Sequence, residues 1–288
     1  MAETKPPRPT LRRIWRALRT PAPNERPPGV PALRYRFPLR WAFSMGRDML
    51  LDRPRSFRAD CALAVRSLPM RPKIEGREHV PREGPFIVVA NHYQRRDLWV
   101  GFCGGLLCDA LWSVRGDLRC RFVITDRALL DGATVPLTRA IFARVARVWD
   151  MILVTPAEAL DAGAEASRRH ALRACLQALR GEGRCSTCLI ISPEGVRGNT
   201  RGLRRAAAGS GRSLLALAAT GAPLLPAAVY EEPGGALRLS FGPAWHPSPP
   251  RDLPKAQLDA WAGDAALRRV AALLPAYLRG GYTEAIAG

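Results

Sequence analysis

Short apolar runs alternate with amphipathic segments along most of the chain. Residues 86–90, 121–125, 150–155, 188–192, 225–230 and 237–241 are apolar runs of strand length. Between or after them, the segments 97–112, 136–148, 156–179, 214–219 and 256–278 carry apolar side chains at helical spacing. Buried strands that alternate with helices are typical of a sheet covered on both faces. The pattern predicts an α/β fold, a single domain with a mostly buried central sheet flanked by helices, plus a basic helical N-terminal extension.

The first seventy residues differ because they are rich in proline, arginine and aromatic side chains. Residues 1–33 are predicted to form a flexible basic segment with one amphipathic helix at 11–20. A basic amphipathic helix that contains a tryptophan is typical of an interfacial membrane anchor. A helix that packs on the protein and a segment that stays disordered are the alternatives. Residues 34–71 predict an N-terminal region of two helices, and residues 72–288 form the main domain with its C-terminal helix.

The chain is strongly basic, with 44 Lys and Arg residues against 25 Asp and Glu residues and a formal net charge of +19. The first 60 residues contain 14 of these basic residues and 5 of the acidic ones, so the charge is concentrated there. The electric field of so much positive charge attracts partners that carry phosphate groups. Because the sequence contains no recognisable nucleic-acid-binding motif, we expect an anionic membrane surface and no nucleic acid. A non-catalytic basic protein that binds a membrane surface or a nucleic acid is the alternative function.

Cysteine usage and hydropathy indicate the compartment. Seven scattered cysteines and the lack of a secretory signal favour a reducing, cytoplasmic setting. Cys185 and Cys188 have CxxC spacing, but they precede an apolar strand and no second pair lies at metal-ligand spacing, so neither a redox nor a zinc role is expected. The longest charge-free run, 213–230, is interrupted by glycine and proline and predicts no transmembrane helix. The expected location is the cytoplasmic face of the membrane, as a peripheral protein.

The strand predicted at 86–90 ends in a polar turn, Asn91-His-Tyr-Gln-Arg-Arg-Asp97. His92 and Asp97 are five positions apart, which is about 500° of rotation on a regular helix. They can meet only if His92 lies in an irregular turn and Asp97 in the first helical turn. A histidine held by a carboxylate at the end of a strand is a candidate general base. A chance histidine beside a helix-capping aspartate is the alternative.

A second polar loop, Ser192-Pro-Glu-Gly-Val-Arg-Gly198, follows the strand predicted at 188–192. Ligand sites in open α/β sheets lie beyond the carboxyl ends of strands, so both loops are candidates for one site. Glu194 and Arg197 are the polar groups of this loop, and Arg197 is suited to bidentate contact with a phosphate. Taken alone, the loop has the alternative interpretation of a solvated turn with an internal ion pair.

Together these motifs resemble the glycerolipid acyltransferase family, in particular its 1-acylglycerol-3-phosphate acyltransferase-like group. The resemblance rests on Asn91-His92-x4-Asp97, on Pro193-Glu194-Gly195-x-Arg197 and on Leu225-Pro226-Ala-Ala-Val229 after an alanine-rich helix. The lead-in to the first motif, residues 74–90, is also similar to that family. The resemblance covers roughly residues 72–242.

The resemblance implies an O-acyltransferase that transfers a fatty acyl group from a thioester donor to the hydroxyl of a lysophospholipid-like acceptor. The donor would be acyl-CoA or acyl-carrier protein, and the acceptor lysophosphatidate or a related lyso-lipid. His92 would deprotonate the acceptor hydroxyl, and Asp97 would orient and charge-stabilise the imidazole. Asn91 or the amides of the turn would help to stabilise the oxyanion. This chemistry requires neither a metal nor a further cofactor.

Acceptor binding is assigned by the same resemblance to both loops. Glu194, Gly195 and Arg197 would position the acceptor and its phosphate, and Arg95 and Arg96 would add positive potential at the turn.

The chain departs from the family pattern at several positions. Ser192 replaces a phenylalanine, Val196 a threonine and Gly198 a serine. The family's second motif usually ends its strand with a phosphate-binding arginine, and the corresponding stretch here, Met151-Ile-Leu-Val-Thr-Pro156, lacks it. The catalytic pair is intact, and a head group other than that of lysophosphatidate is an open alternative.

Overall fold

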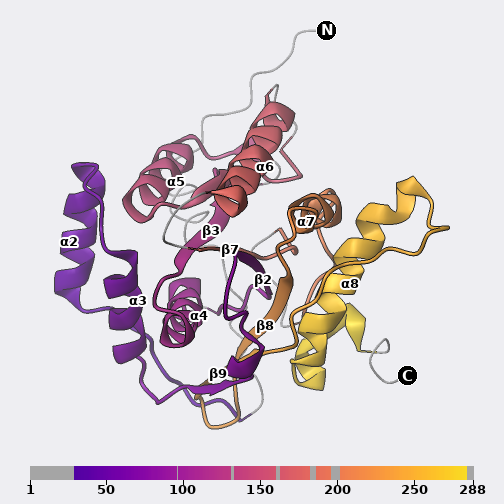
Figure 1. The fold of residues 1–288 in the computed structure, drawn as a ribbon. Coiled ribbons are helices and arrows are strands. Elements are labelled where there is room, and N and C mark those ends of the chain that lie inside the picture. The colour runs from indigo at the N-terminus through magenta and orange to yellow at the C-terminus, as the bar shows by residue number, and fades with distance from the viewer. Residues whose placement is uncertain are drawn as a thin grey trace, which may run out of the picture.

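A seven-stranded sheet forms the centre of the protein (Figure 1). The computed structural model describes residues 29–95, 97–130, 133–159, 163–181, 186–195 and 202–283. Across the sheet the strands follow the order β1 (Lys73–Glu75), β9 (Leu237–Phe241), β8 (Leu224–Glu231), β2 (Phe86–Ala90), β7 (Thr187–Ile191), β3 (Arg119–Thr125) and β6 (Ile152–Val154). The five strands from β8 to β6 are parallel, whereas β9 runs antiparallel to β8.

The central strand β2 is buried on both faces, as its continuous apolar sequence predicts. Because successive side chains of a strand point to opposite faces, Phe86, Val88 and Ala90 join one core while Ile87 and Val89 join the other. Val88 is in register with Ile190 of β7 on one side and Leu225 of β8 on the other. The carboxyl ends of these three strands therefore lie side by side.

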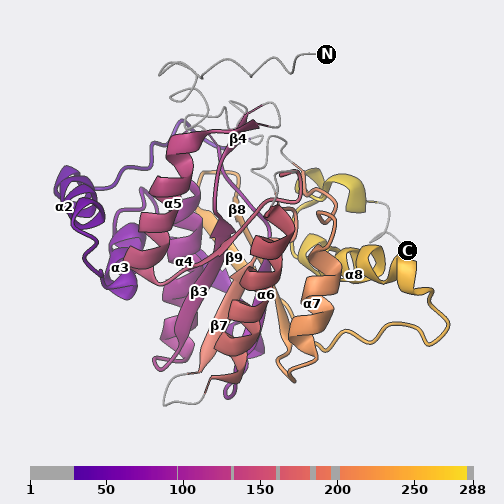
Figure 2. The same ribbon diagram turned by 90° about the horizontal axis from the view of Figure 1, so that it is seen from above.

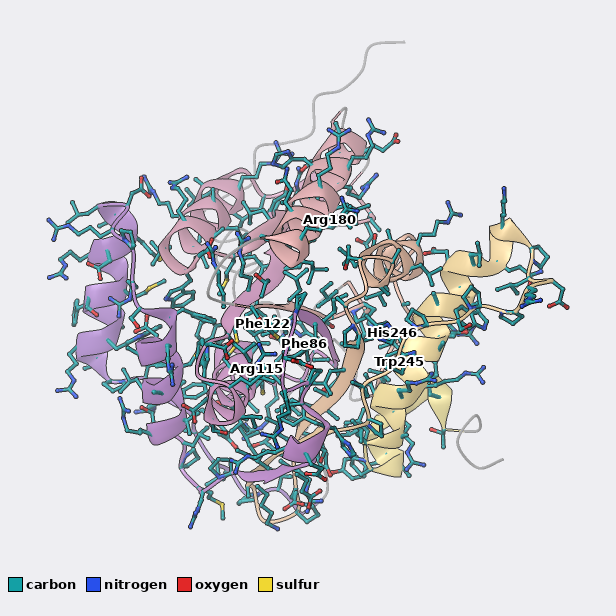
Figure 3. All side chains as sticks on the ribbon, viewed as in Figure 1. Phe86, Arg115, Phe122, Arg180, Trp245 and His246 are labelled. Carbon is teal, nitrogen blue, oxygen red and sulfur yellow. The ribbon has the colours of Figure 1, made fainter. Side chains whose placement is uncertain are left out.

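Helices cover both faces of the sheet (Figures 1 and 2). One face is covered by α3 (Phe57–Arg66) and α4 (Val100–Val114), and the other by α6 (Ala164–Arg180), α7 (Ser210–Ala218) and α8 (Leu258–Ala272). Figure 3 shows Phe86 and Phe122 in the middle of the molecule, between these helical layers. The remaining elements are α2 (Leu39–Leu50), α5 (Pro136–Trp149), the hairpin β4 (Leu129–Leu130) and β5 (Ala133–Thr134), and the 3₁₀ turns Arg77–His79, Lys255–Gln257, Ala276–Leu278 and Gly280–Tyr282.

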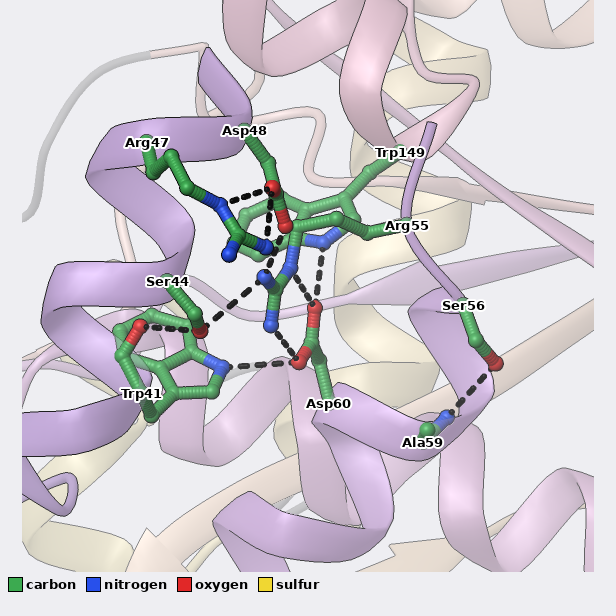
Figure 4. A network of polar contacts seen from close by, with 9 residues as sticks. All are labelled: Trp41, Ser44, Arg47, Asp48, Arg55, Ser56, Ala59, Asp60 and Trp149. Carbon is green, nitrogen blue, oxygen red and sulfur yellow. Dashed lines mark hydrogen bonds and ion pairs between the residues drawn. The ribbon is translucent and has the colours of Figure 1, made fainter. Parts of the chain in front are cut away.

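The helix α2 lies at the outer edge of the protein, on the side opposite to α8 (Figures 1 and 2). A polar network holds its inner face (Figure 4). Arg55 donates to both oxygens of Asp60 at 2.9 and 2.7 Å and to Asp48 of α2 at 2.6 Å. The indoles of Trp41 and Trp149 donate to the same Asp60 carboxylate at 2.8 and 2.9 Å. Burial tends to raise the pKa of Asp60, but these donors outweigh it and the pKa is lowered.

Both sides of α2 carry apolar residues: Met45 and Trp41 pack inward with Trp149, and the outer face is apolar and exposed. Leu39 and Phe43 are each 77 % exposed and Leu50 is 72 % exposed. An open hollow of about 440 Å³ lies along this face and is lined by Ala42, Phe43, Gly46, Arg47, Leu50 and Leu51. The buried ion pairs on the inner face therefore hold α2 in an orientation that leaves its apolar stripe exposed to solvent.

The predicted α/β fold with a central sheet flanked by helices is confirmed. The strands predicted at 86–90 and 237–241 have these bounds, and two helices occur within 34–71. Several predicted bounds differ from the structure, and short strands were missed; for example, the helix expected at 97–112 is Val100–Val114, and the helix expected at 256–278 ends at Ala272. The helix expected from residue 156 begins at Ala164, because Pro156 and Ala159 form a hydrogen-bonded turn. The strand β1 was missed because it has only three residues and no buried side chain.

The basic segment predicted at 1–33, including the amphipathic helix at 11–20, lies almost entirely outside the described residues. Among the helices that the structure does describe, none is long and apolar enough to span a bilayer.

Candidate active site

The two motif loops meet at one edge of the sheet. His92 follows β2, and Glu194 follows the neighbouring strand β7. Both strands are parallel and in register, so their carboxyl ends place the two loops next to each other. This is the arrangement expected from the sequence.

Glu194 connects the loops directly. It is 5 % exposed, and its Oε1 accepts a hydrogen bond from the backbone N–H of His92 at 2.9 Å. Its Oε2 accepts from the backbone N–H of Arg204 at 2.9 Å. Burial raises the pKa of the Glu194 carboxyl, and the two amide donors oppose that effect. The predicted acceptor-positioning residue therefore holds the backbone of the candidate base.

Gly195 gives the second loop its conformation. Its φ of +68° lies in the left-handed region, which side chains other than glycine rarely adopt. A Cβ at this position would lie 2.6 Å from the Cβ of Ala207, so the loop has no space for one. The Ala207 N–H in turn donates to the carbonyl of Pro193 at 2.8 Å. Glycine is thus needed here for the loop to close on the segment before α7.

Asn91 extends the pairing between β2 and β8 by one step. Its side-chain N–H₂ donates to the carbonyl of Val229 at 2.9 Å, and its Oδ1 accepts from the Val229 N–H at 2.9 Å. The side-chain amide of Asn91 therefore makes the same pair of hydrogen bonds that a strand backbone would make with Val229, directly after β2 ends at Ala90. This differs from the predicted oxyanion contact, because the side chain is engaged in the sheet and the His92 amide is engaged by Glu194.

The sequence analysis required Asp97 to lie in the first helical turn after His92, and this was wrong: α4 begins at Val100, and Asp97 lies in the loop before it. A tight turn closed by two backbone hydrogen bonds between Arg95 and Leu98 carries it. Its carboxylate is 3.5 Å from the Arg95 guanidinium, and its side chain is 41 % exposed. The connection from β2 to α4 is therefore irregular at both predicted catalytic positions.

Arg95 was expected to offer its charge to an acceptor phosphate, and the structure shows a different arrangement. The residue is 5 % exposed, and its guanidinium forms a two-point ion pair with Glu231 at 2.7 and 2.8 Å. Glu231 ends β8 and is fully buried. A buried arginine whose charge is matched by a buried carboxylate supplies little potential at the surface of the turn.

A family model described as Acyltransferase matches residues 71–230, which is more than half of the chain and contains both motif loops. The chain belongs to the Acyltransferase family. No curated protein sequence matches this acyltransferase. Among solved structures, the 1-acyl-sn-glycerophosphate (LPA) acyltransferase PlsC from Thermotoga maritima is similar at 15 % sequence identity and a TM-score of 0.48. That match covers 81 % of this chain and 89 % of the PlsC chain.

Two of the predicted acceptor-binding residues of this acyltransferase, Arg96 and Arg197, lie outside the described residues. The second-motif strand β6 ends at Val154, and Thr155 follows it near the position where the family pattern has its arginine. Thr155 is buried and donates to Asp126 at 2.7 Å. Arg127, which follows β3, is paired with Asp126 and donates to the Thr155 hydroxyl at 3.3 Å. Arg127, which follows the neighbouring strand β3, therefore lies next to the position at which this chain lacks the family's arginine.

Sequence reasoning missed the residues that surround Glu231 in this acyltransferase. Tyr35 donates to Glu231 at 2.9 Å and Tyr93 donates to it at 3.2 Å. Tyr35 comes from the segment before α2, at the start of the region that the sequence predicted to be helical. The only available signal was an acidic residue at the end of an apolar strand, and such a residue is usually solvated.

The remaining histidines and cysteines lie elsewhere. His170 and His246 are exposed, and His246 lies beside α8 (Figure 3). Cys188 of the CxxC pair is buried in β7, and Cys185 is outside the described residues. Within the described parts of the chain, no three His, Cys, Asp or Glu side chains are grouped so that they could hold a metal ion.

Proposed function

We propose that this acyltransferase transfers a fatty acyl group from a thioester donor to the hydroxyl of a lysophospholipid-like acceptor. The observation that carries the proposal is the junction of the two motif loops, in which Glu194 holds the backbone of His92 beyond the carboxyl ends of β2 and β7. Membership of the Acyltransferase family supports acyl transfer over the non-catalytic alternative.

In the proposed reaction, His92 accepts the proton of the acceptor hydroxyl as its oxygen attacks the thioester carbonyl carbon. The tetrahedral intermediate collapses, the C–S bond breaks, and the imidazolium returns the proton to the leaving thiolate. The products are the acylated lipid and the free thiol of the donor. Asp97 orients the imidazole and stabilises its charge. Proton transfer by a positioned side chain contributes about 10²–10⁴-fold to such rates.

The remaining site residues divide into two groups in this proposal. Asn91 and Glu194 fix the backbone at and before His92 through their hydrogen bonds, and the positive φ of Gly195 shapes the loop that carries Glu194. Arg96 and Arg197 bind the acceptor phosphate, which rests on the motif resemblance alone. Acyl-CoA or acyl-carrier protein is the donor, and no further cofactor takes part.

An anionic bilayer is the proposed partner of the exposed face of α2. Leu39, Phe43 and Leu50 form an apolar stripe, and exposed arginines, Arg40 and Arg47 among them, flank it. Apolar side chains that insert below the head groups and arginines that meet lipid phosphates are the two contributions by which interfacial helices bind. The anchor predicted at 11–20 would add to this surface.

The segment that leads into α2 contacts the loop of the candidate active site. Phe37, just before α2, stacks on Phe102 of α4 with ring centroids 4.3 Å apart and packs edge-on against Trp99 at 5.7 Å. Trp99 is 49 % exposed and lies two residues after Asp97. The backbone N–H of Tyr35 donates to the Asp97 carbonyl at 3.2 Å. A bilayer that contacts α2 would therefore present its lipids beside the loop of His92.

The test is a product analysis. Purified protein is incubated with labelled acyl-CoA, or with acyl-carrier protein, and a panel of lyso-lipids with different head groups on anionic vesicles. We expect one acylated lipid product, identified by mass, and release of the donor thiol. Binding to the vesicles without any acylated product would instead support the non-catalytic alternative.

A further inference from the structure

The carboxylate of Glu231 is the centre of a buried polar cluster next to the loop of His92. Glu231 has no exposed surface, and its two oxygens accept four hydrogen bonds. Two come from the guanidinium of Arg95, one from Tyr35 and one from Tyr93. Burial and the charge of Glu231 raise the pKa values of both tyrosines, so their hydroxyls stay protonated and donate.

Arg95 links this cluster to Asp97. Its side chain turns inward, where Nη2 also donates to the carbonyl of Leu33 at 3.1 Å. Its Nη1 is 3.5 Å from the Asp97 carboxylate. The guanidinium therefore lies between two carboxylates, of which Glu231 is fully buried and Asp97 is partly exposed.

The two carboxylates are not equivalent partners. The Arg95–Glu231 contacts are two-point and short, whereas the Arg95–Asp97 contact is single and long. A buried guanidinium requires a matching negative charge nearby. As long as Glu231 supplies it, Asp97 is not needed for that purpose. Without the charge of Glu231, Asp97 would be the nearest carboxylate that could replace it.

We propose that Glu231 is a positioning residue for the catalytic turn, which neutralises Arg95 and so keeps Asp97 available to His92. The inference rests on the proposed function, because it assigns Asp97 as the partner of His92. Tyr35 and Tyr93 add donors that fix the Glu231 carboxylate, and Tyr93 directly follows His92 in the chain. Glu231 is the last residue of β8 and lies one residue beyond the region that the family model matches.

The first variant is Glu231→Gln, which keeps the shape of the side chain and removes its charge. We expect kcat to fall about 10- to 100-fold with KM for the acceptor within about twofold, because the base is misoriented while the acceptor site is untouched. The matched control is Glu232→Gln. Glu232 is the next residue, and it pairs instead with Lys73 at 2.6 Å and with Arg238. The control should keep wild-type kcat.

The second variant is Arg95→Met with Glu231→Met, which removes both charges and fills the same space with apolar atoms. We expect it to recover kcat to within about threefold of the wild type, because no uncompensated charge then competes for Asp97. A folded Glu231→Gln protein with wild-type kcat would overturn the proposal. So would a folded double variant that is as slow as Glu231→Gln. If Glu231→Gln does not fold, the folded double variant decides alone, and a kcat more than about tenfold below that of the wild type would overturn the proposal.

A readout that needs no acyl transfer separates this proposal from the proposed function. Amide hydrogen exchange of the peptide that spans residues 91–98 should be faster in Glu231→Gln than in wild type and unchanged in Glu232→Gln. If the wild type makes no acylated lipid, the proposed function fails. The exchange comparison still shows whether Glu231 holds the turn, and equal exchange in all three proteins would refute that role.

Discussion

The backbone N–H of His92 donates a 2.9 Å hydrogen bond to the side chain of Glu194, a hundred and two residues further along the chain. The contact joins the turn after β2 to the loop after β7. It makes the acceptor loop part of the support of the candidate base, because any movement of one loop is transmitted to the other. Glu194 also accepts from the Arg204 N–H, which fixes the carboxylate on its second oxygen.

Glu194→Gln should therefore reduce catalysis although the residue does not perform the chemistry. The side chain of a glutamine has one carbonyl oxygen, which can accept from the amide of His92 or from the amide of Arg204. Its N–H₂ group then faces the other amide, which is also a donor, and that amide loses its acceptor. A buried donor left without an acceptor costs about 1–3 kcal/mol of stability at neutral pH. We expect kcat to fall about tenfold or more, by steady-state kinetics. Glu78→Gln, at an exposed position, is the control and should change neither quantity.

The same variant tests the raised pKa of Glu194. Burial raises the pKa of Glu194 in the folded state above the ordinary glutamate pKa of about 4.3. Between these two pKa values the folded state binds more protons than the unfolded state, so the wild type loses stability as the pH rises. The stability difference between wild type and Glu194→Gln should consequently shrink as the pH rises through this window. Chemical denaturation of both proteins at a series of pH values measures it. A difference that grows with pH there would mean that the pKa is lowered.

Gly195→Ala is expected to distort the second loop. It combines a positive φ with a clash against Ala207, and strain of this kind costs about 1–3 kcal/mol. Gly84→Ala is a close control, because Gly84 has nearly the same φ, +67°, but no atom within 4 Å of the added Cβ. Thermal unfolding and kcat of both variants separate the two effects. Equal losses in the two proteins would show that the contact with Ala207 is unimportant.

Asp60→Asn should loosen α2. The change leaves Arg55, whose side chain is 13 % exposed, with half of its buried ion pairing, and breaking such a pair typically costs about 3–5 kcal/mol. The control is Asp52→Asn, which removes an ion pair with Arg147 in which both side chains are more than half exposed and which should cost about 1 kcal/mol or less. Differential scanning calorimetry at neutral pH compares the two. Similar small losses would contradict the view that the network holds α2 in place.

Vesicle binding should depend on the outer face of α2. Phe43→Asp places a charge in the centre of the apolar stripe and is expected to weaken binding to anionic vesicles at least tenfold, whereas Phe43→Trp should preserve it. Flotation with both variants, and with a chain that lacks residues 1–28, separates α2 from the predicted anchor. This deletion spares Leu33 and Tyr35, which contact the active-site loop. Undiminished binding by Phe43→Asp would exclude α2 as the docking surface.

The order of strands and helices followed from the sequence because the parallel strands are buried on both faces. Residues 86–90 are apolar without interruption, and β2 has these bounds. Two motif loops, each at the end of a buried strand, also predicted a shared site. The α2 helix was harder to interpret, because its buried side carries Asp48 beside the apolar Met45 while its leucines face outward. Apolar periodicity alone does not show which of the two apolar sides of such a helix is buried.

The partners of the charged residues could not be predicted. Arg95 stands among polar residues of the turn and has the appearance of a solvent-exposed cation. Its burial depends on Glu231, more than a hundred residues away, and on Tyr35 before α2. Pairings between residues so far apart are set by strand order, which no local pattern contains. The same holds for the carboxylate of Glu194, whose sequence context indicates a polar loop residue but not its contact with the amide of His92.

The most direct test of the account replaces the base itself. His92→Ala is compared with the wild type on labelled acyl-CoA and the lyso-lipid that the wild type uses, with circular dichroism and thermal unfolding as the check of folding. We predict a folded protein whose acyl transfer falls by at least about 10²-fold. Near-wild-type formation of the acylated lipid by folded His92→Ala would contradict the mechanism.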